Sequence, residues 1–335
     1  MGYRAEKLEI EGKIKVVKRV ALGVVLVVLT GLCVFSAFMP ADTWKYYVGK
    51  PEIDKRGEGE LRIHFLDVGQ GDSTLIELPD GKIVLIDGGN AQEENSTKIL
   101  RYLNALKIDT IDHLVVSHAD SDHCGGLKTV VENKKILTAY LPNTKPTVNA
   151  EYSEFYAAIL KEGCQRVYSS RAVRIGSVFE AYPFTLAFLY PYSNDVFEDA
   201  ETDTNESSSV VWLDYCGVSA LFTGDAPLET ENLLMQDDKL NVFDTVEVSL
   251  TDTEILKVSH HGSADSTSLD FLQYLGVETA VISCGKNNVY GHPSETVQTN
   301  LLAAGAKTYV TAEVGNVVVT VGQEGLYTVK TVLNK

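Results

Sequence analysis

The chain of 335 residues is long enough to bury a substantial core and to form one large domain or two smaller ones. Hydrophobic residues make up 44% of it and charged residues 22%, a balance that excludes an intrinsically disordered protein. The formal net charge of -17 at pH 7 repels polyanions at long range, so a nucleic-acid partner would need local basic groups or metal ions.

An uncharged apolar run at 20–39 lies near the N-terminus. As a helix it would be roughly 30 Å long, enough to cross a membrane. Basic residues precede it, which predicts a cytoplasmic N-terminus and places the rest of the chain outside. A secreted chain with a cleaved signal peptide is the alternative, but the run is long for one and "FSAFMPA" is a poor cleavage site. We therefore predict a basic cytoplasmic tail at 1–19, a single-pass anchor at 20–39, a linker at 40–59 and a folded domain at 60–335.

The five cysteines show neither a CxxC pair nor the spacing of a disulfide framework. A zinc knuckle and a disulfide scaffold are therefore not indicated. One disulfide among Cys124, Cys164, Cys216 and Cys284 stays open as an alternative, because a domain outside the cell is exposed to oxidising conditions.

Apolar periodicity predicts the elements of the folded domain in chain order. Strands at 61–67, 73–78 and 82–87 precede a helix at 96–107, a strand at 111–117 and a helix at 127–133. Further strands are expected at 136–141, 184–190, 208–215, 218–223, 254–259, 278–283, 308–311, 316–321 and 326–331. Further helices are expected at 150–162, 227–235, 266–275 and 294–304. This order favours an α/β protein in which two mixed sheets carry helices on both outer faces.

The segment "VVSHADSDHCGG" at 115–126 places four potential metal ligands within six residues: His118, Asp120, Asp122 and His123. Such a group builds no core, so either a metal ion or a solvated loop must account for it. Residues two apart after a strand can face one metal, while the adjacent pair of Asp122 and His123 can face a second. Two such ions, about 3.5–4 Å apart, would polarise a phosphoryl or carbonyl oxygen and ionise a water.

Other strand ends carry the same kinds of side chain. Asp87 ends the strand at 82–87, Asp225 follows the strand at 218–223, and His260 and His261 follow the strand at 254–259. Carboxyl ends of neighbouring strands converge in layered α/β folds, which is where their ligand sites form. Imidazoles and carboxylates suit a catalytic divalent metal, and Asp225 is placed to bridge two ions.

Six motifs in order along the chain carry a resemblance to known proteins. They are "LDVGQGDS" (66–73), "LIDGG" (85–89), "SHADSDHCGG" (117–126), "LFTGDA" (221–226), "LKVSHHGS" (256–263) and "YGHPS" (290–294). The third is similar to the His-x-His-x-Asp-His signature of the metallo-β-lactamase fold, and 61–331 resembles the extracellular hydrolase domain of the ComEC family of competence proteins. The resemblance implies an αββα sandwich with a two-metal site and a nuclease-like activity.

Carried onto this chain, the resemblance implies a set of metal ligands. His118 and Asp120 would hold one metal, Asp122, His123 and His260 the other, and Asp225 would lie between them. The general family has a further histidine before the "TGD" strand, where this chain has Asn205 in "TNESSSVV" and no histidine. Fewer imidazoles favour a harder ion, so manganese is as plausible as zinc.

Several residues around this set remain open between two roles. His260 is preferred to His261 as a ligand because it directly follows the strand, which leaves His261 to face the substrate or to pack. Asp87 is expected to brace the site from behind rather than to touch metal. Gln70 and Asp72 lie in a glycine turn that would bring them near the site, although a plain tight turn explains the glycines equally well.

His292 in "YGHPS" lies just before a predicted helix, with Pro293 at a first-turn position. There it could present a cation or a backbone N–H to a phosphate. Cys124, beside His123, is expected to be a small buried residue rather than a nucleophile.

These patterns predict a membrane-anchored, extracytoplasmic, metal-dependent hydrolase that acts as a phosphodiesterase or nuclease on DNA. Asp122 would orient the attacking hydroxide or accept its proton, and His292 would stabilise the charge that develops on the phosphoryl oxygens. DNA-uptake components are candidate partners, although one membrane segment is too few for a channel. The alternatives are a hydrolase of a small phosphodiester, ester or lactone, and a noncatalytic binding module with a closed metal site.

Overall fold

The computed structural model describes residues 2–38, 41–171, 173–177, 181–193, 204–236, 240–243 and 246–333. The chain forms two compact units, Met1–Gly49 and Lys50–Lys335. The first unit contains helix α1 (Gly2–Phe38) and a 3-10 helix (Ala41–Tyr46). Within α1, Ile10–Ser36 is long and apolar enough to cross a membrane, and its residues are not buried. Residues 20–38 of the predicted anchor therefore lie in a longer helix, which also includes residues 2–19 of the predicted basic tail; Met1 and Met39 lie outside the described residues.

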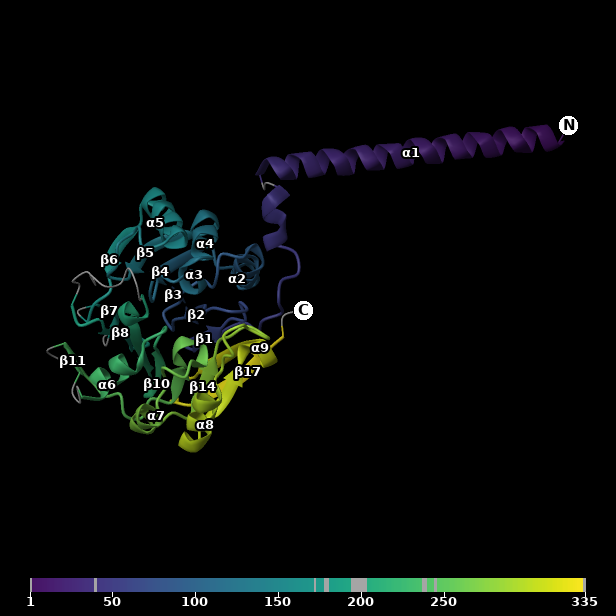
Figure 1. Cartoon of the computed structure of the whole chain (residues 1–335). Coiled ribbons are helices and arrows are strands. Elements are labelled where there is room, and N and C mark those ends of the chain that lie inside the picture. Colours follow the sequence, from purple (N-terminus) through teal and green to yellow (C-terminus); the bar gives the residue numbers. More distant parts are fainter. Residues whose placement is uncertain are drawn as a thin grey trace. The chain divides into compact units, whose positions relative to one another are not determined.

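The larger unit contains two sheets (Figure 1). The strands of the first are β1 (Leu61–Phe65), β2 (Thr74–Glu77), β3 (Ile83–Ile86), β4 (Thr110–Val115), β5 (Lys135–Leu141), β6 (Gln165–Tyr168), β16 (Asn316–Val321) and β17 (Tyr327–Val332). They are ordered β17-β16-β1-β2-β3-β4-β5-β6. The pairs β3–β4, β4–β5 and β5–β6 are parallel, so their carboxyl ends share one edge.

The strands of the second sheet are β7 (Arg174–Ser177), β8 (Phe184–Tyr190), β9 (Val210–Tyr215), β10 (Val218–Phe222), β13 (Ile255–Lys257), β14 (Thr279–Ile282) and β15 (Lys307–Val310). Their order is β15-β14-β13-β10-β9-β8-β7, with the first four strands parallel. A separate small hairpin joins β11 (Leu240–Phe243) to β12 (Val246–Val248).

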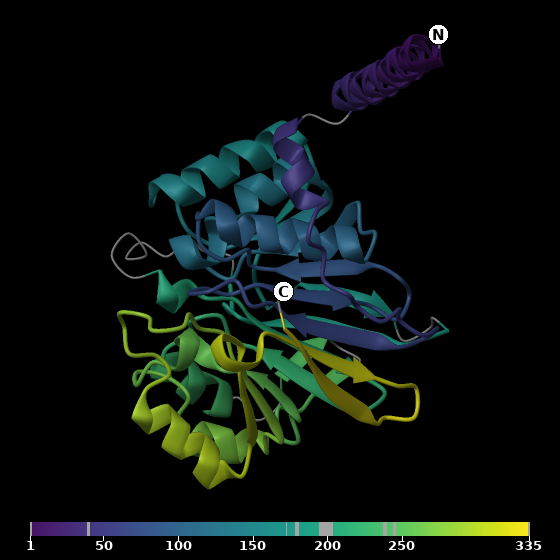
Figure 2. The ribbon, with the colours of Figure 1, turned by 90° about the vertical axis from the view of Figure 1, so that its right-hand side faces the viewer.

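Helices cover the outer face of each sheet (Figure 2). The first sheet carries α2 (Glu93–Ala105), α3 (Ser121–Cys124), α4 (Leu127–Asn133) and α5 (Ala150–Glu162). The second sheet carries α6 (Leu228–Gln236), α7 (Leu269–Leu275) and α8 (Glu295–Ala304), and a short α9 (Thr311–Val314) precedes β16. The expected αββα sandwich is therefore confirmed.

The main core lies between the two sheets. Leu61, Ile63 and Phe65 alternate along β1, and all three belong to one buried cluster with side chains of the second sheet. The ring of Phe65 lies 6.1 Å from that of Phe222 on β10. Each such side chain stabilises the fold by about 1.5–3 kcal/mol. This packing fixes the two sheets face to face and so fixes the spacing of the loops at their edges.

All five cysteines lie within the described residues and are free. Cys124 and Cys284 are buried. The Cys124 thiol donates to the carbonyl of Ala119 at 3.3 Å, and burial raises its pKa, in agreement with a packing role. Cys124 is therefore a poor nucleophile, because the thiolate is the reactive form.

Candidate metal centre

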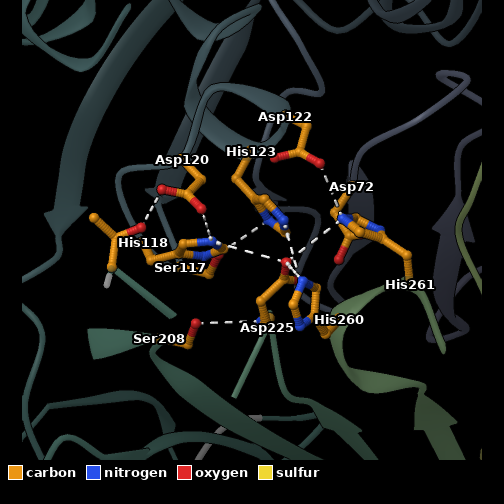
Figure 3. Close-up of polar contacts among 12 residues, drawn as sticks. Asp72, Ser117, His118, Asp120, Asp122, His123, Ser208, Asp225, His260 and His261 are labelled. Atoms are coloured by element: carbon orange, nitrogen blue, oxygen red, sulfur yellow. Dashed lines mark hydrogen bonds and ion pairs between the residues drawn. The ribbon is translucent and has the colours of Figure 1, made fainter. Parts of the chain in front are cut away.

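The predicted ligands meet where parallel strands of both sheets end (Figure 3). Asp87 directly follows β3, Asp225 lies beyond β10, and the two histidines of the "SHHGS" motif lie beyond β13. The loop after β4 carries His118, Asp120, Asp122 and His123. Because the strand ends share an edge, residues up to 189 positions apart in sequence, from Asp72 to His261, lie around one small volume.

Main-chain hydrogen bonds join the loops of the first sheet to one another. The Asp72 N–H donates to the carbonyl of Asp122 at 3.0 Å, and the Gly89 N–H donates to that of Asp72 at 2.7 Å. The Gly88 N–H donates to the carbonyl of His123 at 2.7 Å. Gly71 has a φ of 132°, and a Cβ there would collide with the Asp122 carbonyl. The "DVGQGDS" turn is thus part of the site, with its glycine required for the close approach.

His123 is held from behind by Asp87. The Nδ1 atom of His123 lies 2.9 Å from Asp87 Oδ2, and Asp87 also accepts hydrogen bonds from the Ser117 N–H at 2.8 Å and its hydroxyl at 2.6 Å. Both His123 and Asp87 are buried. Because Nδ1 is occupied, the ring presents Nε2 to the site, which is the arrangement expected of a buttressed metal ligand.

His118 and Asp120 form the other side of the site. The Nδ1 atom of His118 contacts the Ser117 hydroxyl at 3.0 Å, and its Nε2 atom lies 3.7 Å from Asp120 Oδ2. The Thr204 hydroxyl donates to the second oxygen of Asp120. Burial would raise the pKa of Asp120, but the hydrogen bond and charge of His118, together with Thr204, outweigh it and lower the pKa to about 2.

The two adjacent histidines after β13 differ sharply in burial. The His261 side chain is 2% exposed, whereas that of His260 is 29% exposed. The Nδ1 atom of His261 donates to the Ser283 carbonyl at 2.8 Å, and its Nε2 atom lies 3.2 Å from Asp122 Oδ2. The Nε2 atom of His260 lies 3.7 Å from Asp225 Oδ2. The sequence pattern favours His260 as a ligand, but the geometry favours His261.

Backbone strain accounts for this difference between neighbours. His260 has a φ of 47° and His261 a φ of 54°, both in the left-handed region. That conformation costs on the order of 1–3 kcal/mol at each residue and persists where the surroundings impose it. It turns the His261 ring inward and leaves the His260 ring at the rim.

Asp225 lies at the centre of the histidines. Its Oδ1 atom is 3.1 Å from His123 Nε2, and its Oδ2 atom is 3.5 Å from His261 Nε2 and 3.9 Å from His118 Nε2. Its N–H donates to the Ser208 hydroxyl at 3.2 Å. Burial would raise its pKa, but the charges of the surrounding histidines outweigh burial and lower the pKa well below its usual value.

Asp72 and Lys257 form a buried ion pair beneath His261. The Lys257 Nζ atom lies 2.6 Å from Asp72 Oδ2, and Asp72 Oδ1 lies 3.2 Å from His261 Nδ1. Burial would raise the pKa of Asp72, but the charges of Lys257 and His261 lower it to about 2. Asp72 is therefore ionised and orients the His261 ring.

The residues present fit a divalent metal. Ligand atoms of Asp72, His123, Asp225 and His261 all lie within 4.8 Å of one another, and all four residues are buried. Within the part of the chain that the structure describes, five buried atoms here lack a hydrogen-bond partner: Asp72 Oδ1, His118 Nε2, His123 Nε2, His261 Nε2 and Asp225 Oδ1. His123 Nε2 and Asp225 Oδ1 are close enough to pair but have poor hydrogen-bond geometry. Unpartnered imidazole nitrogens around a carboxylate are what a metal ion would satisfy.

Metal binding to this group is expected to release protons. Burial opposes the charged forms of His123 and His261, but the charge of Asp225 and its neighbours raises both pKa values, that of His261 to about 10. Without metal both rings are therefore protonated on both nitrogens at pH 7. A metal can bind Nε2 only by displacing the proton on that atom, so about two protons should leave. Titration calorimetry with zinc in buffers of different ionisation enthalpy measures this number; heats that do not depend on the buffer would contradict it.

The remaining predicted residues lie around this group. The Gln70 Oε1 atom accepts a hydrogen bond from the Gly285 N–H at 3.1 Å, so Gln70 ties the turn before Asp72 to the loop after β14. His292 lies on that loop, with its ring centroid 5.6 Å from that of His260. Asn205 begins a short 3-10 helix (Asn205–Ser207), and the contact to Asp120 from this region comes from Thr204.

Sequence reasoning missed several residues that build the site: Ser117, Thr204, Ser208, Lys257 and Ser283. Lys257 had a recognisable signal, because a lysine within the apolar run "EILKVS" must find a buried partner. The serines and the threonine had none, since short hydroxyl side chains are common at strand ends for local reasons.

Comparisons with known proteins agree with this geometry. A family model described as the metallo-beta-lactamase superfamily matches residues 66–286, a segment that contains every loop of the buried group. ComE operon protein 3 of Bacillus subtilis is 31% identical over 255 residues, which cover 72% of this chain and 30% of that protein. Competence protein ComA of Neisseria gonorrhoeae is 32% identical over 250 residues, which cover 75% of this chain and 31% of that protein. The chain thus spans about 30% of the length of these curated relatives.

Among solved structures, the metallo-beta-lactamase fold protein YhfI from Bacillus subtilis is similar with a TM-score of 0.49. Its sequence identity is 11%, and the match covers 81% of this chain and 100% of that one.

Proposed function

This chain belongs to the metallo-beta-lactamase superfamily, and we propose that it is a membrane-anchored phosphodiesterase that cleaves DNA outside the cytoplasm. The family is in general hydrolytic and metal-dependent, and the buried histidine and aspartate group supports a metal-dependent hydrolase here. The observation that carries the proposal is the set of inward Nε2 atoms without partners around Asp225, each on a ring whose Nδ1 atom is already hydrogen-bonded.

We assign the ligands from this arrangement. One divalent metal, zinc or manganese, would be held by His118 and Asp120, and a second by Asp122, His123 and His261. Asp225 would lie between the two, because its carboxylate faces histidines of both groups. This assignment replaces His260 by His261. Because there are two such ligand groups, we propose two metal ions.

Each remaining side chain has a role that its position supports. Divalent ions in this set would ionise a water molecule and withdraw charge from a phosphoryl oxygen. Asp122 is 28% exposed, so its carboxylate can orient that water or accept its proton. His260 and His292 are partly exposed at the rim, where they would contact phosphate oxygens. Burial and the charges of His261 and His260 lower the pKa of His292, so it would donate as a neutral ring.

The choice of DNA rests on the relatives and is constrained by charge. One relative bears the name competence protein, and the ComEC-like motifs imply an activity on DNA. A net charge of -17 provides no general attraction for a polyanion, so binding would depend on the metals and on local groups at the rim. The basic residues before the apolar part of α1 support a single-pass anchor with the larger unit outside the cytoplasm. DNA-uptake components are the partners that this setting favours.

The test uses the full chain in detergent, stripped of metal and reloaded with manganese or zinc. Digestion of single- and double-stranded DNA is followed for the wild type, Asp122→Ala and Asp80→Ala. We expect metal-dependent cleavage that falls at least about 100-fold in Asp122→Ala. Asp80 lies in the turn between β2 and β3, at the opposite end of the sheet, so Asp80→Ala should keep full activity.

Equal cleavage by Asp122→Ala and the wild type would refute the site. Absence of DNA cleavage after confirmed metal loading would exclude the nuclease. The substrate would then be a small phosphodiester, an ester or a lactone, each of which can be tested with chromogenic analogues. A fully coordinated metal with no water ligand would instead identify a noncatalytic module.

A further inference from the structure

An exposed aromatic ring stands beside the candidate metal centre. Tyr290 lies on the loop between β14 and α8 (Figure 1), and it is 67% exposed. Its ring centroid is 5.7 Å from that of His292, at an interplanar angle of 26°. An exposed aromatic ring stacked on a residue of the site offers its free surface to an apolar or aromatic group of a ligand.

The stack continues inward from Tyr290. The His292 ring lies 6.3 Å from the His261 ring at an interplanar angle of 28°. Three rings, each tilted by less than 30° from the next, therefore connect the exposed surface with the buried histidine and aspartate group. His260 lies edge-on to His292, at 5.6 Å and 75°. The exposed face of Tyr290 is thus the outer end of a row of rings that begins at the proposed metal ligands.

The loop that carries Tyr290 is held in place by Asn288. The Asn288 side chain donates to the carbonyls of Gly285 at 2.9 Å and His292 at 2.6 Å, and it accepts from the His292 N–H at 2.9 Å. The Gln70 side chain fixes Gly285 in turn. The rings therefore need little ordering when a ligand arrives, which lowers the entropy cost of binding.

We propose that the exposed face of Tyr290 stacks against a nucleobase of the substrate, next to the phosphate that is cleaved. This inference rests on the proposed function and names its substrate class as a strand with unpaired bases. Bases within a duplex are stacked on their neighbours and cannot cover Tyr290 without being extruded, whereas unpaired bases can.

The net charge of this chain favours a contact that does not depend on a basic surface. A protein with a net charge of -17 gains little from the general attraction between basic surfaces and the phosphate backbone. Stacking on an aromatic ring is insensitive to salt and to net charge, and it tolerates any base because every base has a π face. Lys286 is exposed on the same loop and adds a local cation.

The test compares two single strands of equal length that carry the same fluorescent label. One is oligothymidine, and the other has abasic tetrahydrofuran sugars in place of the nucleosides. With the full chain loaded with manganese in detergent, we expect the KM for the abasic strand to be roughly 10-fold higher than that for the base-bearing strand. In Tyr290→Ala this ratio should fall to near 1.

Further variants separate stacking from general apolar contact. Tyr290→Phe and Tyr290→Trp keep a π face and should keep the ratio, whereas Tyr290→Leu should lose it. Tyr168→Ala is the matched control, because Tyr168 is 45% exposed and lies on the edge strand β6. Thermal unfolding of each variant checks that the fold is intact.

Two results separate this inference from the proposed function. If the wild type cleaves both strands with the same KM, or if the ratio survives in Tyr290→Ala, stacking is overturned and the nuclease stands. If the metal-loaded wild type cleaves neither strand and leaves double-stranded DNA intact as well, the proposed function is overturned. Fluorescence anisotropy with the same two strands then decides the inference: a preference for bases that disappears in Tyr290→Ala upholds it, and no preference overturns it.

Discussion

The Asp225→Asn variant is expected to bind zinc or manganese more than about 100-fold more weakly than the wild type and to lose hydrolysis with it. An asparagine preserves the shape of the side chain but removes its charge. The carboxylate of Asp225 lies between His118, His123 and His261, at 3.1–3.9 Å from their Nε2 atoms. It is the group that faces both proposed ion positions, so no other residue can replace it.

The measurement is metal content after gel filtration, together with the hydrolysis assay. Asp214→Asn is the control, because it removes a half-buried carboxylate from β9 of the same sheet. Asp214 pairs with Ser219 at the start of β10, whereas Asp225 lies beyond the end of that strand. We expect Asp214→Asn to keep its metal and its activity. Full metal content in Asp225→Asn would disprove the central position of Asp225.

The strand ends were the most informative feature of the sequence. Apolar runs that stop abruptly at aspartate or histidine predict both where a strand ends and which side chains converge there. Asp87, His118 and Asp225 follow β3, β4 and β10 in this way, and all lie at the site. Parallel pairing explains why this works, since it places successive carboxyl ends at one edge.

The choice between His260 and His261 could not be made from the pattern. If the strand continued through both residues, the two rings would point to opposite sides. The residue nearer the strand, His260, would then be the expected metal ligand. Instead both residues adopt left-handed backbone conformations, which residue type alone does not predict for histidine. The inward ring is thereby the second. Tertiary contacts, including the hydrogen bond from His261 to the Ser283 carbonyl, determine this conformation.

Short strands at the edges were also missed. The side chains of β6 are largely exposed, so its sequence "QRVY" lacks the alternation that a half-buried strand would show. β7 and the hairpin of β11 and β12 are only three or four residues long, and unlike the equally short β3 (IVLI) they are interrupted by polar residues or glycine. None of these elements carries a residue of the buried group, which is why their omission did not affect its prediction.

The buried pair of Lys257 and Asp72 gives the largest expected effect on stability. Both residues are buried, and the Nζ atom also donates to the carbonyl of Val258 at 2.7 Å. In Lys257→Met the carboxylate of Asp72 stays buried without its cation, which costs about 3–5 kcal/mol in the free energy of unfolding. For a domain of this size that corresponds to a fall of roughly 10 °C in Tm.

The pH dependence of this loss has a definite sign. In the wild type, Lys257 and His261 lower the pKa of Asp72 to about 2 against the opposing effect of burial, so the ionised pair contributes stability above pH 3.8 that is lost as the pH falls toward 2. Without Lys257, only the neighbouring histidines oppose burial, so the pKa of this carboxyl is higher than in the wild type. Protonation then relieves the unpaired charge, and the difference in Tm between variant and wild type should narrow as the pH falls from 7 to 5.

A second buried lysine provides the control. The Lys134 side chain is 3% exposed, but its carboxylate partner at 3.2 Å, Asp109, is 89% exposed. Lys134→Met leaves that carboxylate in water, so it should cost far less than Lys257→Met, although both remove a buried ammonium group. In the double variant Asp72→Asn/Lys257→Met no charge is left unpaired, and most of the lost stability should return. Equal Tm values for the two single lysine variants would show that Lys257 does not stabilise the buried carboxylate of Asp72. The orientation of His261 would then depend on its hydrogen bond to the Ser283 carbonyl alone.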